Sequence, residues 1–147
     1  MKSIIILFFI GLFGFFQSKQ IDFFGTKIKV NPICEVKNST VFYQKNLLTW
    51  LDAPPEMFRN MILSKVKEKI ETEKYTEVGT TDLNIKLLKF KWLGKISKFK
   101  KENNDSITNF IQLYATIKGK ERLLMMVYKT PKNEAFRIPK YFDFLNK

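Results

Sequence analysis

The chain has 147 residues, a formal net charge of +12, one cysteine and no histidine. Without histidine it cannot form a Ser-His-Asp or Cys-His catalytic site or an imidazole-ligated metal site, and a single cysteine excludes an intramolecular disulfide. We therefore expect a non-enzymatic protein without a cofactor. A histidine-independent enzyme that uses carboxylates, lysine or tyrosine is the open alternative.

The first part of the chain has the pattern of a secretory signal peptide. Lys2 gives a charged start, residues 4–16 are apolar or glycine without interruption, and residues 17–20 form a polar exit. As a helix the apolar run spans about 20 Å, which is short against the roughly 30 Å of a bilayer core. We therefore predict a signal peptide over residues 1–20 and a single α+β domain over residues 21–147, secreted or periplasmic. An uncleaved membrane anchor is the alternative.

The sequence pattern at the beginning of the domain predicts three strands. Alternation of apolar and lysine residues predicts a strand over Asp22–Val30, and two further strands at Thr40–Tyr43 and Leu47–Leu51 form a hairpin that turns near Lys45-Asn46. We interpret Cys34, between these elements, as a small buried apolar residue.

A helix follows these strands. Pro55 is expected at the first helical position, and the helix should end near Glu73–Tyr75. Its apolar stripe, with spacings of three and four, consists of Phe58, Met61, Ile62, Val66 and Ile70. We expect this stripe to pack on a sheet, and a helix that lies on a membrane or binds a partner is the alternative.

The next stretch predicts a loop and two strands. Tyr75–Asp82 contains Gly79-Thr80-Thr81 and is expected to be a loop, while Leu83–Trp92 and Lys95–Lys101 have strand composition. Gly94 is expected to form a turn or bulge between these strands, and residues 102–105 form a further turn.

Two long segments, Ile107–Ile117 and Arg122–Thr130, predict a hairpin around which the fold is organised. With Gly119-Lys120 as the turn, Ala115 lies opposite Leu124. One face then carries Ile111, Leu113, Ala115, Ile117, Leu124, Met126 and Tyr128. The other face carries Gln112, Tyr114, Thr116, Leu123, Met125 and Val127. Because both faces are largely apolar, the hairpin should lie in the middle of a sheet with layers on both sides.

A short C-terminal helix starting at Pro139 would supply the second layer through Tyr141, Phe142, Phe144 and Leu145. The expected fold class is therefore α+β. It has an antiparallel sheet of about five to seven strands, one main amphipathic helix on one face, and a short C-terminal helix on the other.

This order of elements, with Trp92-Leu93-Gly94 and the closing Tyr141-Phe142-Asp143-Phe144-Leu145, resembles the Mog1/PsbP-like family. The resemblance implies an α/β/α sandwich and a non-enzymatic accessory or binding protein, and it transfers no functional residue to this chain. A cystatin/NTF2-like arrangement, in which a meander wraps a helix, is the alternative.

Seven lysines form the candidate anion-binding surface: Lys86, Lys89, Lys91, Lys95, Lys98, Lys100 and Lys101. Strand alternation places Phe90 and Trp92 on the face opposite Lys89 and Lys91, which disfavours stacking of nucleic-acid bases on the rings. The competing interpretation is that these lysines are ordinary solvated residues and reflect a lysine-rich composition.

We find no catalytic, metal or cofactor-binding motif. We expect an exported protein that acts through its surface on another envelope or secreted protein. The alternatives are binding to an anionic membrane surface or other polyanion, and carriage of a small ligand.

Overall fold

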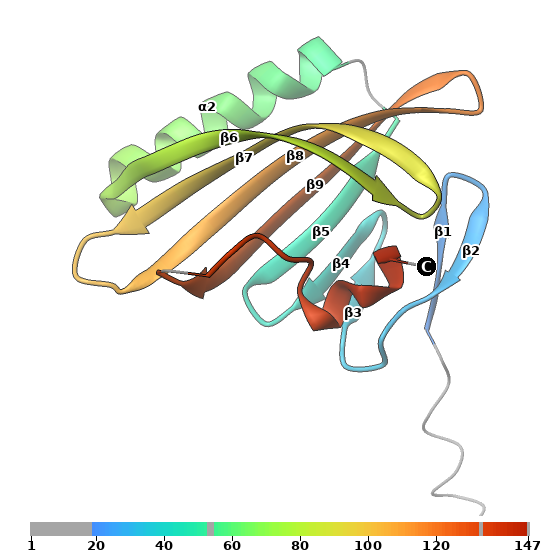
Figure 1. Ribbon diagram of the computed structural model, residues 1–147, viewed down its shortest axis with the longest axis horizontal. Coiled ribbons are helices and arrows are strands. Elements are labelled where there is room, and N and C mark those ends of the chain that lie inside the picture. The colour runs from blue at the N-terminus through green and yellow to red at the C-terminus, as the bar shows by residue number, and fades with distance from the viewer. Residues whose placement is uncertain (1–18, 53–54, 133, 147) are drawn as a thin grey trace, which may run out of the picture.

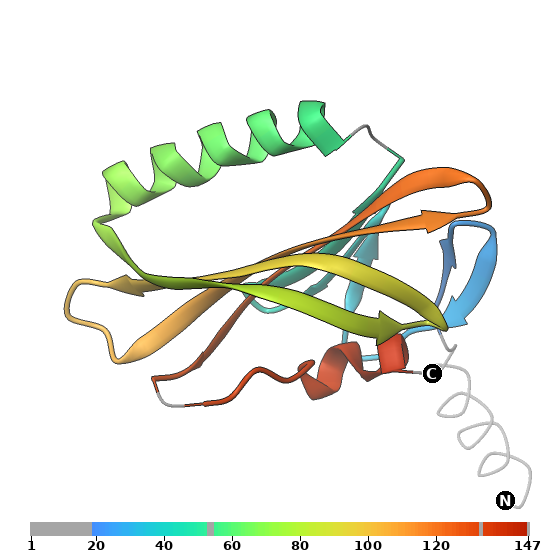
Figure 2. The same cartoon turned by 45° about the horizontal axis from the view of Figure 1, so that its top comes forward.

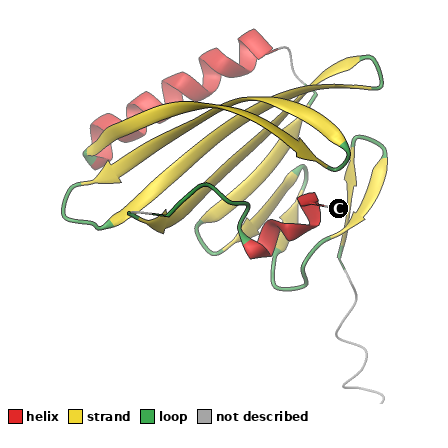
Figure 3. Ribbon diagram, in the orientation of Figure 1, coloured by secondary structure: helices red, strands yellow, loops and turns green. Residues whose placement is uncertain are grey.

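The computed structural model describes residues 19–52, 55–132 and 134–146. About half of the described chain belongs to one antiparallel sheet of seven strands (Figures 1 and 3). From one edge to the other its strands are β3 (Glu35–Lys37), β4 (Thr40–Tyr43), β5 (Asn46–Leu51), β9 (Lys120–Pro131), β8 (Ser106–Ile117), β7 (Phe90–Lys101) and β6 (Tyr75–Leu87). The predicted central hairpin, β8–β9, therefore does lie in the middle of the sheet.

Separate layers cover the two faces of this sheet. The helix α2 (Pro55–Glu73) lies over one face, and the short 3₁₀ helix η1 (Lys140–Asn146) lies on the opposite side (Figure 2). A two-stranded hairpin of β1 (Gln20–Phe23) and β2 (Thr26–Lys29) packs on the same side as η1. The predicted fold class, an antiparallel sheet with the main helix on one face and a short C-terminal helix on the other, is confirmed.

The main core lies between the sheet and the η1 layer. Trp50 and Trp92 from the sheet meet Phe23 of β1 at ring-centroid distances of 5.5 and 6.2 Å. Phe142 of η1 is fully buried in the same cluster. Each such side chain contributes about 1.5–3 kcal/mol on burial. Cys34 is also buried here, as expected, and its thiol donates a hydrogen bond to the Tyr141 carbonyl at 3.4 Å.

The β8–β9 turn differs from the predicted one. Its central residues are Lys118 and Gly119, with φ of 54° and 72°, so it is formed by Lys118-Gly119 rather than Gly119-Lys120. Ala115 consequently lies opposite Arg122 instead of Leu124. This shift of two residues preserves the alternation of side chains, so the residues predicted for each face of the hairpin do share that face.

Three other predictions about the strands and turns are wrong. Asp22–Val30 is not one strand, because Phe24 and Gly25 adopt positive φ and turn the chain between β1 and β2. Tyr75–Asp82 is not a loop but the first half of β6, and the turn that follows is at Leu88-Lys89. Gly94, expected in a turn or bulge, lies inside β7 opposite Leu113.

The helix begins at Pro55, as predicted, and ends at Glu73, where Lys74 takes a φ of 54°. Ile70 packs against the sheet cluster of Phe99, Phe110 and Leu123, which confirms the stripe at its C-terminal end. Met61 is 48% exposed, so the stripe prediction is wrong there. The remaining stripe positions, Phe58, Ile62 and Val66, fall outside the side chains that the structure describes.

The predicted signal peptide lies almost entirely outside the described residues. Its last two residues nevertheless belong to the fold: the Val30 amide donates to the Lys19 carbonyl at 2.8 Å, and Gln20 pairs with Lys29. Among the helices that the structure describes, none has both the length and the apolar character needed to cross a bilayer.

Candidate ligand-binding cleft

An apolar cleft of about 260 Å³ lies between the C-terminal half of α2 and the sheet. Its sheet side is built from one cross-strand row, because Phe110 of β8 lies opposite Val127 of β9, and Val127 lies opposite Leu47 of β5. Phe99 and Met125 lie on the same face, and Ile70 of α2 closes the cleft from the helix side. Residues far apart in the sequence thus form one hydrophobic surface.

The rim of this cleft is basic. Lys65 and Lys69 reach it from α2, and Lys45 reaches it from the turn between β4 and β5. All three are exposed residues, and a lysine at such a rim can border apolar space with its methylene stem while its ammonium group remains in water.

A polar pocket of about 560 Å³ continues the cleft toward the β7–β8 turn. The two spaces share lining residues: Lys45, Lys69, Tyr75, Thr108 and Val127. Beyond them the polar pocket adds Lys101, Lys129, Glu73 and Glu102, so that four lysines face two glutamates. The combined site therefore has an apolar part and a part with excess positive charge.

The ion pairs at the polar end leave much of this positive charge available. The Glu73 carboxylate forms an ion pair with Lys69 at 3.8 Å and accepts a hydrogen bond from Lys101 at 3.5 Å, and all three side chains are at least 41% exposed. Exposed pairs of this kind contribute only about 0–1 kcal/mol, so an incoming anion can compete for the lysines. The Lys101 ammonium also lies 5.7 Å from the Tyr75 ring centroid, which helps to hold it at the junction of the two spaces.

This arrangement can bind a molecule with a hydrophobic chain and an anionic head. The cleft excludes water from the chain, while the lysines attract the head. In the described part of the chain, no group of three or more cysteine, aspartate and glutamate residues comes together in a way that could hold a metal ion.

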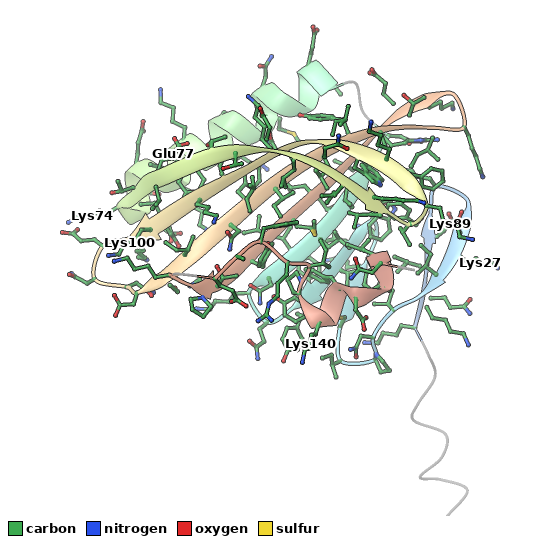
Figure 4. All side chains as sticks on the ribbon, viewed as in Figure 1. Lys27, Lys74, Glu77, Lys89, Lys100 and Lys140 are labelled. Atoms are coloured by element: carbon green, nitrogen blue, oxygen red, sulfur yellow. The ribbon has the colours of Figure 1, made fainter. Side chains whose placement is uncertain are left out.

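The seven lysines predicted as an anion-binding surface do not share one surface. By strand register, Lys86, Lys91, Lys95 and Lys101 lie on the α2 face, whereas Lys98 and Lys100 lie on the η1 face and Lys89 is in the β6–β7 turn. Figure 4 shows Lys89 and Lys100 toward opposite ends of the molecule. Among the seven, Lys101 alone lines the cleft or its polar extension.

Four lysines of the site were not predicted from the sequence: Lys45, Lys65, Lys69 and Lys129. The usable signal was the apolar second face of the central hairpin, which includes Met125 and Val127. A face of that kind must be covered, and the lysines that border the covering helix then become candidates for the rim.

Comparisons with protein-family models, with curated proteins and with solved structures found no match. The resemblance to the Mog1/PsbP-like family stays a prediction.

Proposed function

We propose that the protein is an exported, non-enzymatic binding protein that carries an amphipathic anion, such as a medium-chain carboxylate, in the cleft between α2 and the sheet. One observation carries this proposal: the apolar cleft is continuous, through shared residues, with a pocket lined by four lysines. A polyanion-binding surface has less support, because the seven lysines proposed for it are divided between two faces and a turn.

The size of the cleft defines the hydrophobic part of the ligand. An engineered cavity of about 150 Å³ holds one benzene molecule, so about 260 Å³ accommodates roughly ten carbon atoms. Each buried methylene contributes about 0.8 kcal/mol, so affinity should rise by roughly fourfold per methylene until the space is filled.

A chain-length series tests the cleft. We expect hexanoate, octanoate and decanoate to bind the purified protein with increasing affinity in isothermal titration calorimetry, and dodecanoate to add little. Val127→Trp should reduce decanoate affinity at least about tenfold by occupying the space of a few methylenes. Val78→Trp is the matched control, since Val78 lies on edge strand β6 and is 58% exposed. Equal affinity across the series, or equal loss in both variants, would contradict the proposal.

A head-group comparison tests the lysines. The double change Lys45→Gln and Lys69→Gln should weaken decanoate binding several-fold, because each lysine near the anion contributes on the order of 1 kcal/mol, and the loss should shrink at high salt. Decanol, which carries no charge, should bind both proteins alike. The control is Lys86→Gln with Lys95→Gln, two exposed lysines outside the cleft. A matching loss in this control would show that net charge alone is responsible.

The proposal of export is supported by the pattern of residues 1–20 and is tested by N-terminal mass spectrometry of the secreted protein. We expect the mature chain to start at or before Lys19, since a chain that starts at Ile21 would lose the Lys19 and Gln20 contacts to β2 and Val30. Retention of the complete N-terminal segment in the secreted protein would contradict cleavage.

A further inference from the structure

A separate pocket of about 520 Å³ lies on the η1 side of the sheet, at the end where the β1–β2 and β8–β9 turns approach each other (Figures 1 and 2). The residues that matter for its chemistry are Phe24, Ser39, Trp50, Asp52, Lys118 and Arg122. None of them lines the cleft between α2 and the sheet, so this pocket is a different site.

Arg122 is the unusual residue of this pocket, because its charged side chain is 9% exposed. Leu51 pairs with Leu123 across β5 and β9, so the next residues, Asp52 and Arg122, also come together. Their side chains form an ion pair through guanidinium Nη1, and the Phe24 ring centroid lies 4.7 Å from the guanidinium carbon. The Nε and Nη1 atoms are both buried, and neither forms a hydrogen bond with the described residues.

This pairing leaves N–H donors of the Arg122 guanidinium without an acceptor. A guanidinium can offer two parallel N–H groups to one planar carboxylate, and a buried donor without an acceptor is costly. Asp52 contacts Nη1 from a side chain that is 61% exposed, so water can solvate its carboxylate once an incoming carboxylate has taken its place beside the buried guanidinium. The guanidinium cannot leave in the same way, because it is enclosed by the fold.

Lys118 adds a second positive charge. A Cβ at residue 25 would come within 2.7 Å of the Lys118 ammonium, so the glycine there provides the space that this group occupies. The nearby Asp22 carboxylate already accepts the Gly25 amide at 2.6 Å, which keeps it engaged within its own turn. The pocket lining thus carries two cations, Lys118 and Arg122, and two carboxylates, of which Asp52 pairs with Arg122 and is the exchangeable one.

We propose that this pocket binds a small carboxylate ligand with a flat apolar body. The ligand carboxylate displaces Asp52 from the Arg122 guanidinium and is also attracted by Lys118, while the body contacts the wall formed by Phe24 and Trp50. Asp52 acts as the resident counter-ion of Arg122 when the pocket holds no ligand.

The test uses benzoate as the probe and benzamide as its neutral isostere, with the ¹⁵N-labelled protein observed by NMR at constant ionic strength. We expect benzoate to shift the amide signals of Gly25 and Ser39, which line the pocket, in a saturable way, and to leave Gly79 on edge strand β6 unchanged. Benzamide or added sodium chloride that shifts Gly25 and Ser39 as much as benzoate overturns the proposal. So does a benzoate response confined to Val127, which belongs to the cleft.

Variants separate a binding site from a merely structural ion pair. Asp52→Asn should tighten benzoate binding about threefold by removing the competing carboxylate, and Lys118→Gln should weaken it about fivefold. Lys120→Gln, in the same hairpin but outside the pocket lining, should leave the affinity unchanged. Weaker binding in Asp52→Asn, or equal losses in both lysine variants, overturns the proposal. Both variants leave Arg122 itself unchanged.

Discussion

At the scale of single residues, Gly94 shows how closely two strands can approach when one side chain is missing. It lies in the middle of β7 opposite Leu113 of β8. A Cβ added there would come within 2.9 Å of the Leu113 Cα and would collide with the Gln112 carbonyl oxygen. Both obstacles are backbone atoms in the centre of the sheet, so they cannot turn aside as a flexible side chain can.

We therefore predict that Gly94→Ala lowers the free energy of unfolding by about 2–4 kcal/mol, since β7 and β8 must separate to admit the methyl group. Gly79→Ala in β6 is the control, because a Cβ there would meet nothing within 4 Å. Urea denaturation of both variants measures the difference. Similar urea midpoints for the two variants would show that β7 and β8 can separate at Gly94 at little cost in free energy.

At the scale of elements, η1 is a short segment that the main core depends on. Phe142 and Phe144 are almost completely buried, and the Leu88 amide donates to the Leu145 carbonyl at 2.9 Å, which joins η1 to the β6–β7 turn. η1 consists of two short helical pieces joined at a kink at Phe142, and such short pieces have little stability of their own, so packing must hold this element in place.

Phe142→Ala should therefore destabilise the protein by about 3–5 kcal/mol, because it leaves a cavity beneath the sheet. The neighbouring Asp143 is exposed, so Asp143→Ala should change the free energy of unfolding by less than about 0.5 kcal/mol. Thermal unfolding followed by circular dichroism distinguishes the two. A small effect of Phe142→Ala would mean that η1 is an accessory to the core and not part of it.

The sequence pattern predicted some strands of this sheet correctly and missed others. Alternation placed the residues of β8 and β9 on the correct faces, because a strand has a fixed period of two. It could not choose between Lys118-Gly119 and Gly119-Lys120, since both contain a glycine that tolerates positive φ. The first half of β6 was missed because residues 76–82 of this edge strand are exposed on both faces and show no alternation.

At the scale of the whole molecule, both candidate sites depend on pairing that a local pattern cannot specify. The β5–β9 register brings Leu47 beside Val127 in the cleft and Asp52 beside Arg122 in the second pocket. These partners come from opposite sides of α2 in the sequence. Composition could predict that Met125 and Val127 needed a cover, but not which lysines would surround it.

Burial of tyrosines gives the molecule a characteristic response to alkaline pH. Burial raises the pKa of Tyr128, and burial together with the neighbouring Tyr43 raises the pKa of Tyr141 to about 12. Tyrosines in the unfolded chain ionise near pH 10. Above about pH 10 the unfolded chain therefore releases protons that the folded protein retains, and the free energy of unfolding falls between about pH 10 and 12.

We predict that the urea midpoint is insensitive to these tyrosines below pH 9 and declines at higher pH. Tyr141→Phe, which cannot ionise, should show a shallower decline than the original protein. Unfolding curves at pH 8, 10 and 11 provide the measurement. Parallel declines in both proteins would assign the alkaline response to other groups, such as the lysines.

The irregularity in β6 has a consequence for behaviour in concentrated solution. Within the described residues β6 pairs with β7 alone, and its register skips at Val78, between Glu77 and Gly79. Such a bulge bends the edge strand of a sheet. A bent edge strand pairs poorly with a strand from another chain. Deletion of Val78 should straighten the β6 edge strand. We expect the shortened protein to form fibrils that bind thioflavin T under conditions in which the original protein remains in solution.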